Sequence, residues 1–151
     1  MWNRSTSSIY PRFWSLPHSS QVLLFIMTIN THKIGRKGEA IAQDFLKEKG
    51  YRILETNYRD QSEEIDIIAQ DGAAICFIEV KMRNSQRYGH PLESITPNKQ
   101  RRLARAALRY LHNQGTCEVE TRFDVVAILP RGQGDMDIEL VKNAFQYDQS
   151  F

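Results

Sequence analysis

Residues 77–82, Phe-Ile-Glu-Val-Lys-Met, and residues 64–68, Glu-Ile-Asp-Ile-Ile, are the two stretches that decide the fold. Both have the short apolar character of strands, yet each carries ionisable residues that a buried strand normally excludes. Successive side chains of a strand point to opposite faces, so Glu79 and Lys81 share one face. Asp66 lies between two isoleucines, and burying it unpaired would cost several kcal/mol. This aspartate therefore needs a partner: a metal ion, another cation, or an edge that admits water.

A hairpin is expected between these two strands because Asp71-Gly72 is a strong turn signal. A two-residue turn there would set Gln70 opposite Ala73 and Asp66 diagonal to Glu79. Diagonal cross-strand neighbours are about 7–8 Å apart, close enough for two carboxylates to converge on an ion. A bulge or twist would be needed to bring both carboxylates to one face.

The pattern around this hairpin predicts an α/β fold in which the two hairpin strands pair antiparallel. A strand, a helix and a further strand in succession imply a right-handed crossover and one parallel pair of strands. Apolar periodicity, caps and turn signals place the elements as follows. Helices are expected over residues 34–49, ended by Gly50, and over 97–112, capped by Thr96; strands are expected over 51–59, 64–70, 74–82, 122–129 and 138–143.

Length and composition indicate a single globular domain. The chain has 151 residues, 25% charged and 41% hydrophobic, and its two cysteines are too few for a disulfide framework. A reducing compartment, and hence the cytoplasm, fits this usage. The formal net charge is +2, but residues 1–26 contribute two arginines and no acid, so the rest is neutral. A partner must therefore be argued from where the charge lies.

Residues 1–33 differ from the rest, being rich in serine and free of acids. The apolar run at 22–27 is far shorter than the ~20 residues of a membrane span, so no membrane partner is expected. We interpret this segment as a poorly ordered extension, with Met27 as an alternative start. A signal or transit segment and a structured N-terminal element are the other interpretations. A folded domain at 34–145 and a tail at 146–151 complete the predicted organisation.

Two carboxylates on neighbouring strands can hold one hard cation such as Mg²⁺ or Mn²⁺. Asp66 and Glu79 are the candidate ligands, and the carbonyl of Val80 could add a third. Lys81 would face the same pocket and could orient a water or stabilise charge on a phosphate. The alternative interpretation of Glu79-Val80-Lys81 is an ordinary solvated pair on an exposed strand. The aspartate in the preceding strand favours the metal site over that alternative.

The second helix carries basic residues and no acid from residue 97 to 111. Such a face either is simply solvated or tracks the phosphates of a nucleic acid, contacts that position DNA without reading its sequence. Asp124 lies in an apolar strand, where an ion pair with Arg122 or a helix arginine is the structural interpretation. The candidate nucleic-acid-binding residues are Arg59, Arg83, Lys99, Arg101, Arg102 and Arg105.

Several short motifs together resemble the PD-(D/E)xK nuclease superfamily. They are Gly-Glu at 38–39, Asn-Tyr-Arg at 57–59, Glu-Ile-Asp at 64–66, Phe-Ile-Glu-Val-Lys at 77–81 and Thr-Pro-Asn-Lys-Gln at 96–100. The chain is most similar to a small bacterial family of proposed endonucleases of the YraN type, related to Holliday-junction resolvases. The resemblance implies a restriction-endonuclease-like fold, which is a mixed central sheet flanked by helices. It also implies a metal-dependent DNA endonuclease acting on branched or otherwise structured DNA.

The resemblance also implies a role for each matching residue. Asp66 and Glu79 would bind divalent metal, Lys81 would be the catalytic lysine, and Glu39 would be a further acid. Gln100 matches a helix position that supports the site in related nucleases. A homodimer is expected by analogy with the resolvases alone.

One position departs from the pattern of these relatives, which usually have glycine before Glu-Ile-Asp, where this chain has Glu63. Glu63 would change the local loop geometry and add negative charge near bound DNA. Two other functions stay open: a nucleic-acid-binding or DNA-processing accessory protein that keeps the fold without cleaving, and an interaction module whose basic helix docks an acidic partner.

Overall fold

The computed structural model describes residues 35–61, 63–83, 91–116, 118–132 and 135–147. The predicted N-terminal extension at 1–33 and most of the tail at 146–151 lie outside these residues. Within them, no helix is long and apolar enough to cross a membrane.

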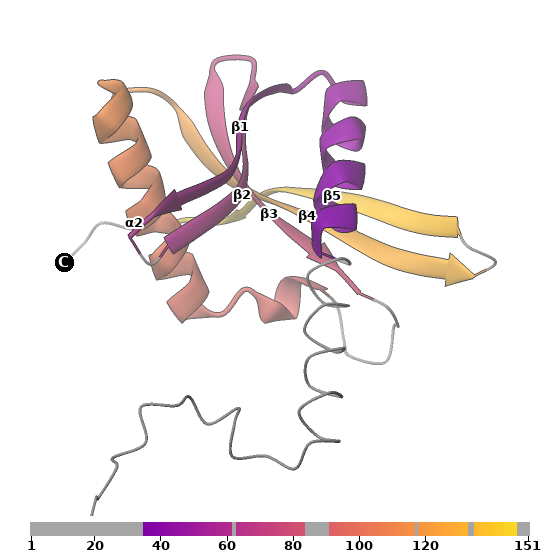
Figure 1. Ribbon diagram of the computed structural model, residues 1–151. Helices are drawn as coiled ribbons and strands as arrows, with labels where there is room; N and C mark the ends of the chain where they lie inside the picture. Colours follow the sequence, from indigo (N-terminus) through magenta and orange to yellow (C-terminus); the bar gives the residue numbers. More distant parts are fainter. Residues whose placement is uncertain (1–34, 62, 84–90, 117, 133–134, 148–151) are drawn as a thin grey trace, which may run out of the picture. The chain divides into compact units, whose positions relative to one another are not determined.

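The centre of the fold is a five-stranded sheet in the order β1-β2-β3-β4-β5 (Figure 1). Neighbouring strands are antiparallel except β3 and β4, which are parallel and joined through α2. The α/β class and the mixed sheet are thereby confirmed. The strands are β1 (Arg52–Asp60), β2 (Glu63–Asp71), β3 (Ala74–Met82), β4 (Thr121–Gly132) and β5 (Asp135–Phe145), and a 3₁₀ turn, η3 (Pro91–Ser94), precedes α2 (Pro97–Gln114).

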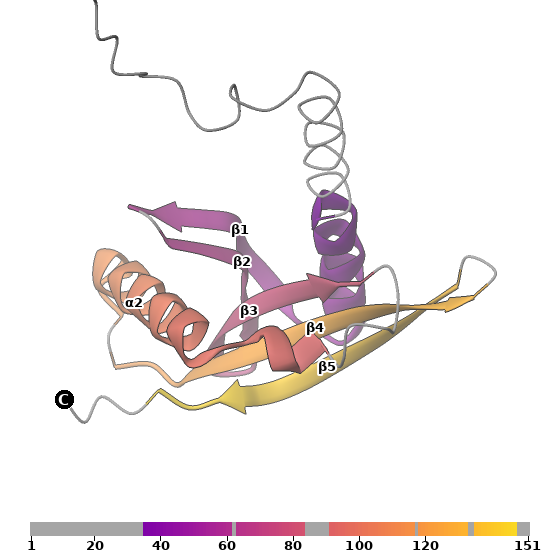
Figure 2. The same cartoon turned by 90° about the horizontal axis from the view of Figure 1, so that it is seen from below.

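Two helices flank the sheet (Figures 1 and 2). The first is described over residues 35–48, as predicted, and Gly50 follows it with a φ of +89°. Its buried Ala42 and Leu46 pack on Ile67 and Ile78 of the sheet. A methyl group on Gly38 would lie 3.0 Å from the Cβ of Met82, so the glycine permits this close approach of helix and strand.

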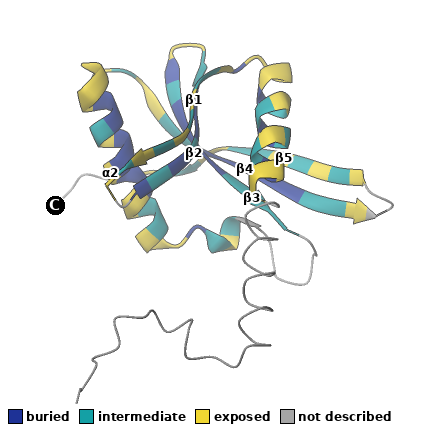
Figure 3. Ribbon diagram, in the orientation of Figure 1, coloured by how far each residue is buried: buried dark blue, intermediate teal, exposed yellow. Residues whose placement is uncertain are grey.

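Helix α2 packs on the opposite face of the sheet, against the alternate side chains of the same strands. Thr96 caps its first turn, Pro97 takes the first helical position, and Gly115 ends it at a φ of +66°, as the sequence predicts. Leu103, Ala106, Ala107, Tyr110 and Leu111 form its buried stripe and cover Phe77 of β3. Figure 3 shows this buried side of α2 turned toward the sheet, with exposed residues on its outer side.

The β2–β3 hairpin turns one residue later than predicted. Gln70 pairs with Ile75, not with Ala73, and the turn consists of Gly72 and Ala73 rather than of Asp71 and Gly72. Gly72 has a φ of +62°, which glycine adopts without a steric penalty. A turn displaced by one residue moves the cross-strand partner by two, so the predicted register was wrong by two residues.

Strand β2 bends near its middle. Ile65 and Ile68 both belong to the cluster under α2, although a flat strand would place them on opposite faces. Ile67, between them, packs under the helix at residues 35–48. Asp66 therefore lies at the bend, beside residues of both clusters.

Candidate active site

Asp66 and Glu79 lie on neighbouring strands where the β2–β3 pairing ends. The last paired residues are Ile67 and Ile78, and one more step along this register sets Asp66 against Glu79, directly rather than diagonally. The main-chain N–H of Val80 donates to Oδ2 of Asp66 at 2.7 Å. An aspartate side chain thus accepts the bond that a main-chain carbonyl would accept in a continuing ladder. The metal-binding role predicted for the Val80 carbonyl stays a prediction.

Glu79 is buried, with 2% of its surface exposed, and two lysines reach it. Nζ of Lys81 lies 2.5 Å from Oε1, and Nζ of Lys99, from α2, lies 3.1 Å from Oε2. Despite this short distance, Oε2 has no hydrogen bond of acceptable geometry within the described part of the chain. Lys99 and Glu79 therefore form an ion pair, but the ammonium of Lys99 does not donate a well-oriented hydrogen bond to Oε2.

The surroundings of Asp66 favour its protonated form. Burial first, and then the negative charge of Glu79, raise the pKa of Asp66 to about 7, while the N–H of Val80 and the charges of Lys99 and Lys81 act in the opposite direction. A carboxylate with so high a pKa is only partly ionised at neutral pH. A cation bound beside it would favour the ionised form and release a proton.

The donor set fits a hard divalent cation. Mg²⁺ is commonly held by one or two carboxylates, with waters and substrate phosphates in the remaining positions, and Oε2 of Glu79 is a buried oxygen without a hydrogen bond. Among residues 35–61, 63–83, 91–116, 118–132 and 135–147, no three His, Cys, Asp or Glu residues gather closely enough to hold a metal. Glu39, half-buried on the helix at residues 35–48, is therefore not grouped with Asp66 and Glu79.

Sequence reasoning missed the contact of Lys99 with Glu79. Lys99 lies in the first turn of α2, where its N–H donates to Oγ1 of Thr96 at 3.2 Å. The positive end of the helix dipole disfavours a cation in the first turn, so this lysine was itself a signal for a nearby acid. Gln100, predicted to support the site, donates its side-chain amide to the carbonyl of Ile95 at 3.1 Å and so holds the loop before α2.

The other predicted nucleic-acid-binding residues have different surroundings. Arg101 is exposed on α2. Arg59 donates through Nε and Nη2 to Oε1 of Glu64, at 3.1 and 3.0 Å. Arg83 donates its main-chain N–H to the carbonyl of Ile128 at 3.0 Å, and its Nε is buried without a hydrogen bond to any described residue.

Glu63 is covered by two of the predicted DNA-binding arginines. Nε of Arg102 donates to its Oε2 at 2.7 Å, and Nη2 of Arg105 donates to its Oε1 at 2.8 Å. The hydrogen bonds from Arg105 and Arg102 lower the pKa of Glu63. The negative charge of Glu63 is thus offset within the protein.

A second group of polar and charged residues, the Arg122 cluster (Tyr51, Asp71, Arg122, Asp124 and Lys142), lies on the face covered by the helix at residues 35–48 and surrounds the buried Asp124. Arg122 donates through Nε and Nη2 to the two oxygens of Asp124, at 2.8 and 2.9 Å, which confirms the predicted ion pair. Hydrogen bonds from Lys142, at 2.8 Å, and from Arg122, at 2.7 Å, lower the pKa of Asp71 to about 2.

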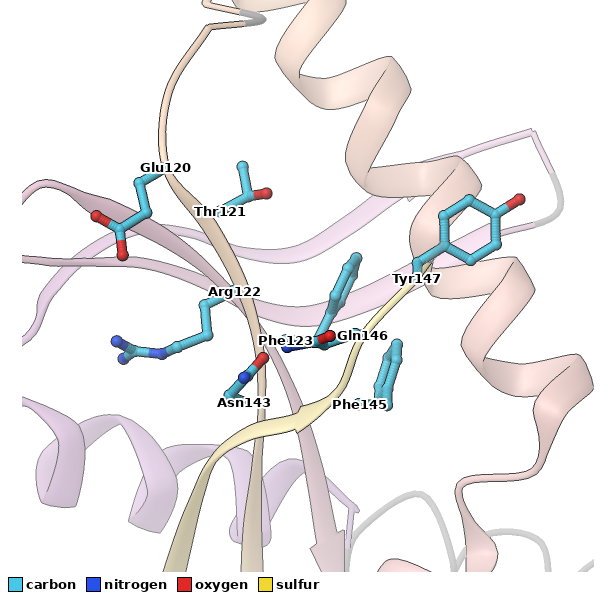
Figure 4. A pocket seen from close by; sticks show the side chains of 8 residues that line it. All are labelled: Glu120, Thr121, Arg122, Phe123, Asn143, Phe145, Gln146 and Tyr147. Carbon is cyan, nitrogen blue, oxygen red and sulfur yellow. The ribbon is translucent and has the colours of Figure 1, made fainter. Parts of the chain in front are cut away.

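A pocket of about 420 Å³ opens near this cluster, at the start of β4 and the end of β5 (Figure 4). Neither Asp66 nor Glu79 lines it, so we place the candidate site by its chemistry rather than at this hollow. Its lining residues are Glu120, Thr121, Arg122, Phe123, Asn143, Phe145, Gln146 and Tyr147.

The fold and the site define an α/β protein with a mixed five-stranded sheet and a buried carboxylate–lysine cluster at the edge of its central hairpin. The chain belongs to the uncharacterised protein family UPF0102, whose model matches residues 38–128. It is 53% identical to a UPF0102 protein of Chlorobium phaeobacteroides strain BS1 over 68% of this chain and 82% of that protein. It is 47% identical to the UPF0102 protein of Symbiobacterium thermophilum over 76% of this chain and 98% of that protein.

Proposed function

We propose that the protein is a Mg²⁺- or Mn²⁺-dependent endonuclease that hydrolyses phosphodiester bonds of DNA. The observation that carries the proposal is the pair of carboxylates on adjacent strands, Asp66 and Glu79, with Lys81 on the same strand as Glu79 and in contact with it. The resemblance of these residues to the PD-(D/E)xK nucleases supports the same function.

Asp66 and Glu79 would hold the divalent cation in this proposal. A divalent cation supplies a Lewis acid that offsets phosphate charge and eases the ionisation of water. The buried Glu79 carboxylate is fixed between two lysines, so its position is set before any ligand arrives. Glu39 remains the proposed additional acid, and it would have to come nearer than the described arrangement places it.

Lys81 and Lys99 would act on the phosphate and on the attacking water. The Lys81 side chain is 28% exposed and that of Lys99 is 27% exposed, so both ammonium groups are accessible to a substrate. An ammonium at this place can donate to a phosphate oxygen as charge develops there, or orient a water for attack. Lys99 brings this second positive charge from α2 rather than from the sheet.

DNA would be held by its backbone. Helix α2 has no acid between residues 97 and 111 and presents Arg101 to solvent. Phosphate contacts position a duplex without reading its bases, so recognition would follow the structure of the DNA, branched forms included. We place this activity in the cytoplasm, and a homodimer follows from the analogy with resolvases.

A non-cleaving, DNA-binding accessory protein is the second candidate function. The specific observation that favours it is the lack of a third metal ligand among the described acids, cysteines and histidines. Such a protein would retain the basic helix and the fold while the two carboxylates serve only as partners for the lysines.

Cleavage of linear and four-way-junction DNA, with Mg²⁺, Mn²⁺ or EDTA, separates the two. We expect wild type to cleave only with a divalent cation and Lys81→Ala to be inactive, with Lys47→Ala, an exposed lysine of the helix at residues 35–48, as the matched control. Equal product from wild type and Lys81→Ala on every substrate would refute the endonuclease and favour the accessory protein.

A further inference from the structure

Glu63 lies beneath two arginines of α2 and is far less exposed than they are. Its side chain is 6% exposed, whereas those of Arg102 and Arg105 are 45% and 51% exposed. Each carboxylate oxygen accepts from a different guanidinium, at 2.7 and 2.8 Å. The two arginines therefore cover the acid, and a large part of each arginine faces solvent.

The hydrogen bonds to Glu63 fix the guanidinium groups of Arg102 and Arg105 next to each other before any ligand binds. A guanidinium carries five N–H donors in a planar fork that matches the oxygens of a phosphate. Arginine side chains lose much rotamer freedom when they bind, and a fixed buried acceptor removes part of that loss beforehand. The neighbouring Arg101, which is fully on the exposed side of α2, shows no contact of this kind within the described residues.

We propose that Arg102 and Arg105, held in place by the buried carboxylate of Glu63, form a binding site for one backbone phosphodiester of the nucleic-acid substrate. Glu63 is a positioning residue, and the two arginines bind. This inference rests on the proposed function, because it assumes that nucleic acid lies along α2.

The distance to the carboxylates suits this site. Arg102 and Arg105 follow Lys99 by three and six residues, about 4.5 and 9 Å along the helix axis. Phosphates of one strand rise by about 3.4 Å per nucleotide along a duplex. A strand with one phosphate at Glu79 would therefore place a phosphate roughly one to three nucleotides away over the two arginines.

The test is the salt dependence of DNA binding in EDTA, measured by fluorescence anisotropy with a 20-base-pair duplex for wild type, Glu63→Gln and Glu48→Gln. Both substitutions remove one negative charge, but Glu48 is an exposed residue of the helix at residues 35–48 and lies on neither α2 nor β2. Simple electrostatics would make both variants bind more tightly. We expect Glu48→Gln to do so and Glu63→Gln to bind about tenfold more weakly, with the log–log salt slope reduced by about one phosphate contact.

Equal affinities and slopes for the two variants, with wild type binding normally, would overturn the inference and leave the proposed nuclease intact. Binding as expected but without cleavage in Mg²⁺ would leave the inference standing and remove the nuclease. Failure of wild type to bind DNA would overturn both. If Glu63→Gln does not fold, the double variant Arg102→Lys, Arg105→Lys is used instead, because it keeps both positive charges and removes the planar guanidinium groups. An unchanged salt slope in this variant would refute the site, and a slope reduced by about one phosphate contact would support it.

Discussion

The two charged clusters on opposite faces of the sheet differ in how completely their carboxylate oxygens are hydrogen-bonded. Both oxygens of Asp124 accept from Arg122, one also accepts from the main-chain N–H of Asn143, and Tyr51 donates to the other. Oε2 of Glu79, on the α2 face, has no hydrogen bond within the described residues, and it lies beside an Asp66 whose pKa is raised.

The difference separates a structural cluster from one suited to a ligand. Buried charges that are paired and fully hydrogen-bonded fix the packing of the elements that supply them. A buried carboxylate with a raised pKa, or with an oxygen that accepts no hydrogen bond, is destabilised in its ionised form. A bound cation would stabilise that form. The Arg122 cluster therefore holds β4 and β5 to the first strands, whereas the Asp66–Glu79 pair provides the chemistry proposed for the protein.

The largest expected effect is the loss of cleavage in Asp66→Asn. The amide cannot supply a negative charge to a divalent cation, so we expect cleavage in saturating Mg²⁺ to fall by about 10³-fold, or about 4 kcal/mol. The rate is measured on the best DNA substrate, under single-turnover conditions. Near wild-type cleavage by this variant would show that Asp66 belongs with the structural cluster instead.

The converse substitution, Asp124→Asn, should reduce stability rather than activity. Removing this charge leaves Arg122 partly uncompensated in the interior, and breaking a buried pair costs about 3 kcal/mol. Urea unfolding of this variant and of the exposed control Glu48→Gln measures the loss. A stable Asp124→Asn that fails to cleave would contradict the division between the two clusters.

The two clusters should also depend on pH in opposite directions. Asp66 has a pKa near 7 in the folded, metal-free protein against 3.8 ordinarily, so the folded state binds more protons between these values. The free energy of unfolding should therefore fall as pH rises from about 4 to about 7, by about 3 kcal/mol. Asp71, with its pKa lowered to about 2, adds stability that is lost only as pH falls below about 4 toward 2.

Urea unfolding in EDTA at pH 5 and pH 8 checks the first window. Wild type should be less stable at pH 8 because of Asp66, and Asp66→Asn should lack that part of the change. An identical difference between the two pH values in wild type and variant would show that burial does not raise the pKa of Asp66.

The sequence was sufficient for the elements because their signals are local. Thr96, Pro97 and Gly115 mark the two ends of α2, and alternating apolar residues mark the strands. It was insufficient for the register of the β2–β3 hairpin, because both Asp71-Gly72 and Gly72-Ala73 can form a turn around one glycine. Only the packing of both faces selects the second.

The sequence pattern brings Asp66, Glu79 and Lys81 together, but it did not predict the contact of Lys99 with Glu79. Asp66, Glu79 and Lys81 lie within one hairpin, so strand geometry brings them together. Lys99 and the arginines reach their acids across tertiary contacts between α2 and the sheet, and no local pattern specifies which acid each will meet. Glu63 in particular gave an expectation of repulsion from DNA, whereas tertiary pairing offsets its charge.

The smallest expected effect tests the role of Lys99 in the unloaded site. Its ammonium lies 3.1 Å from Oε2 of Glu79, where a divalent cation would approach, so the two positive charges compete for one carboxylate. We expect Lys99→Gln to bind Mn²⁺ about three- to tenfold more tightly, corresponding to about 1 kcal/mol for a partly exposed pair. Calorimetric titration of the metal-free protein measures the affinity. Lys142→Gln removes an equal charge from the Arg122 cluster and should leave the Mn²⁺ affinity unchanged, because within the described residues no buried side-chain oxygen of that cluster lacks a hydrogen bond. An equal increase in Mn²⁺ affinity in both variants would show that net charge alone causes the effect. The two clusters would then not differ in the way that their hydrogen bonds indicate.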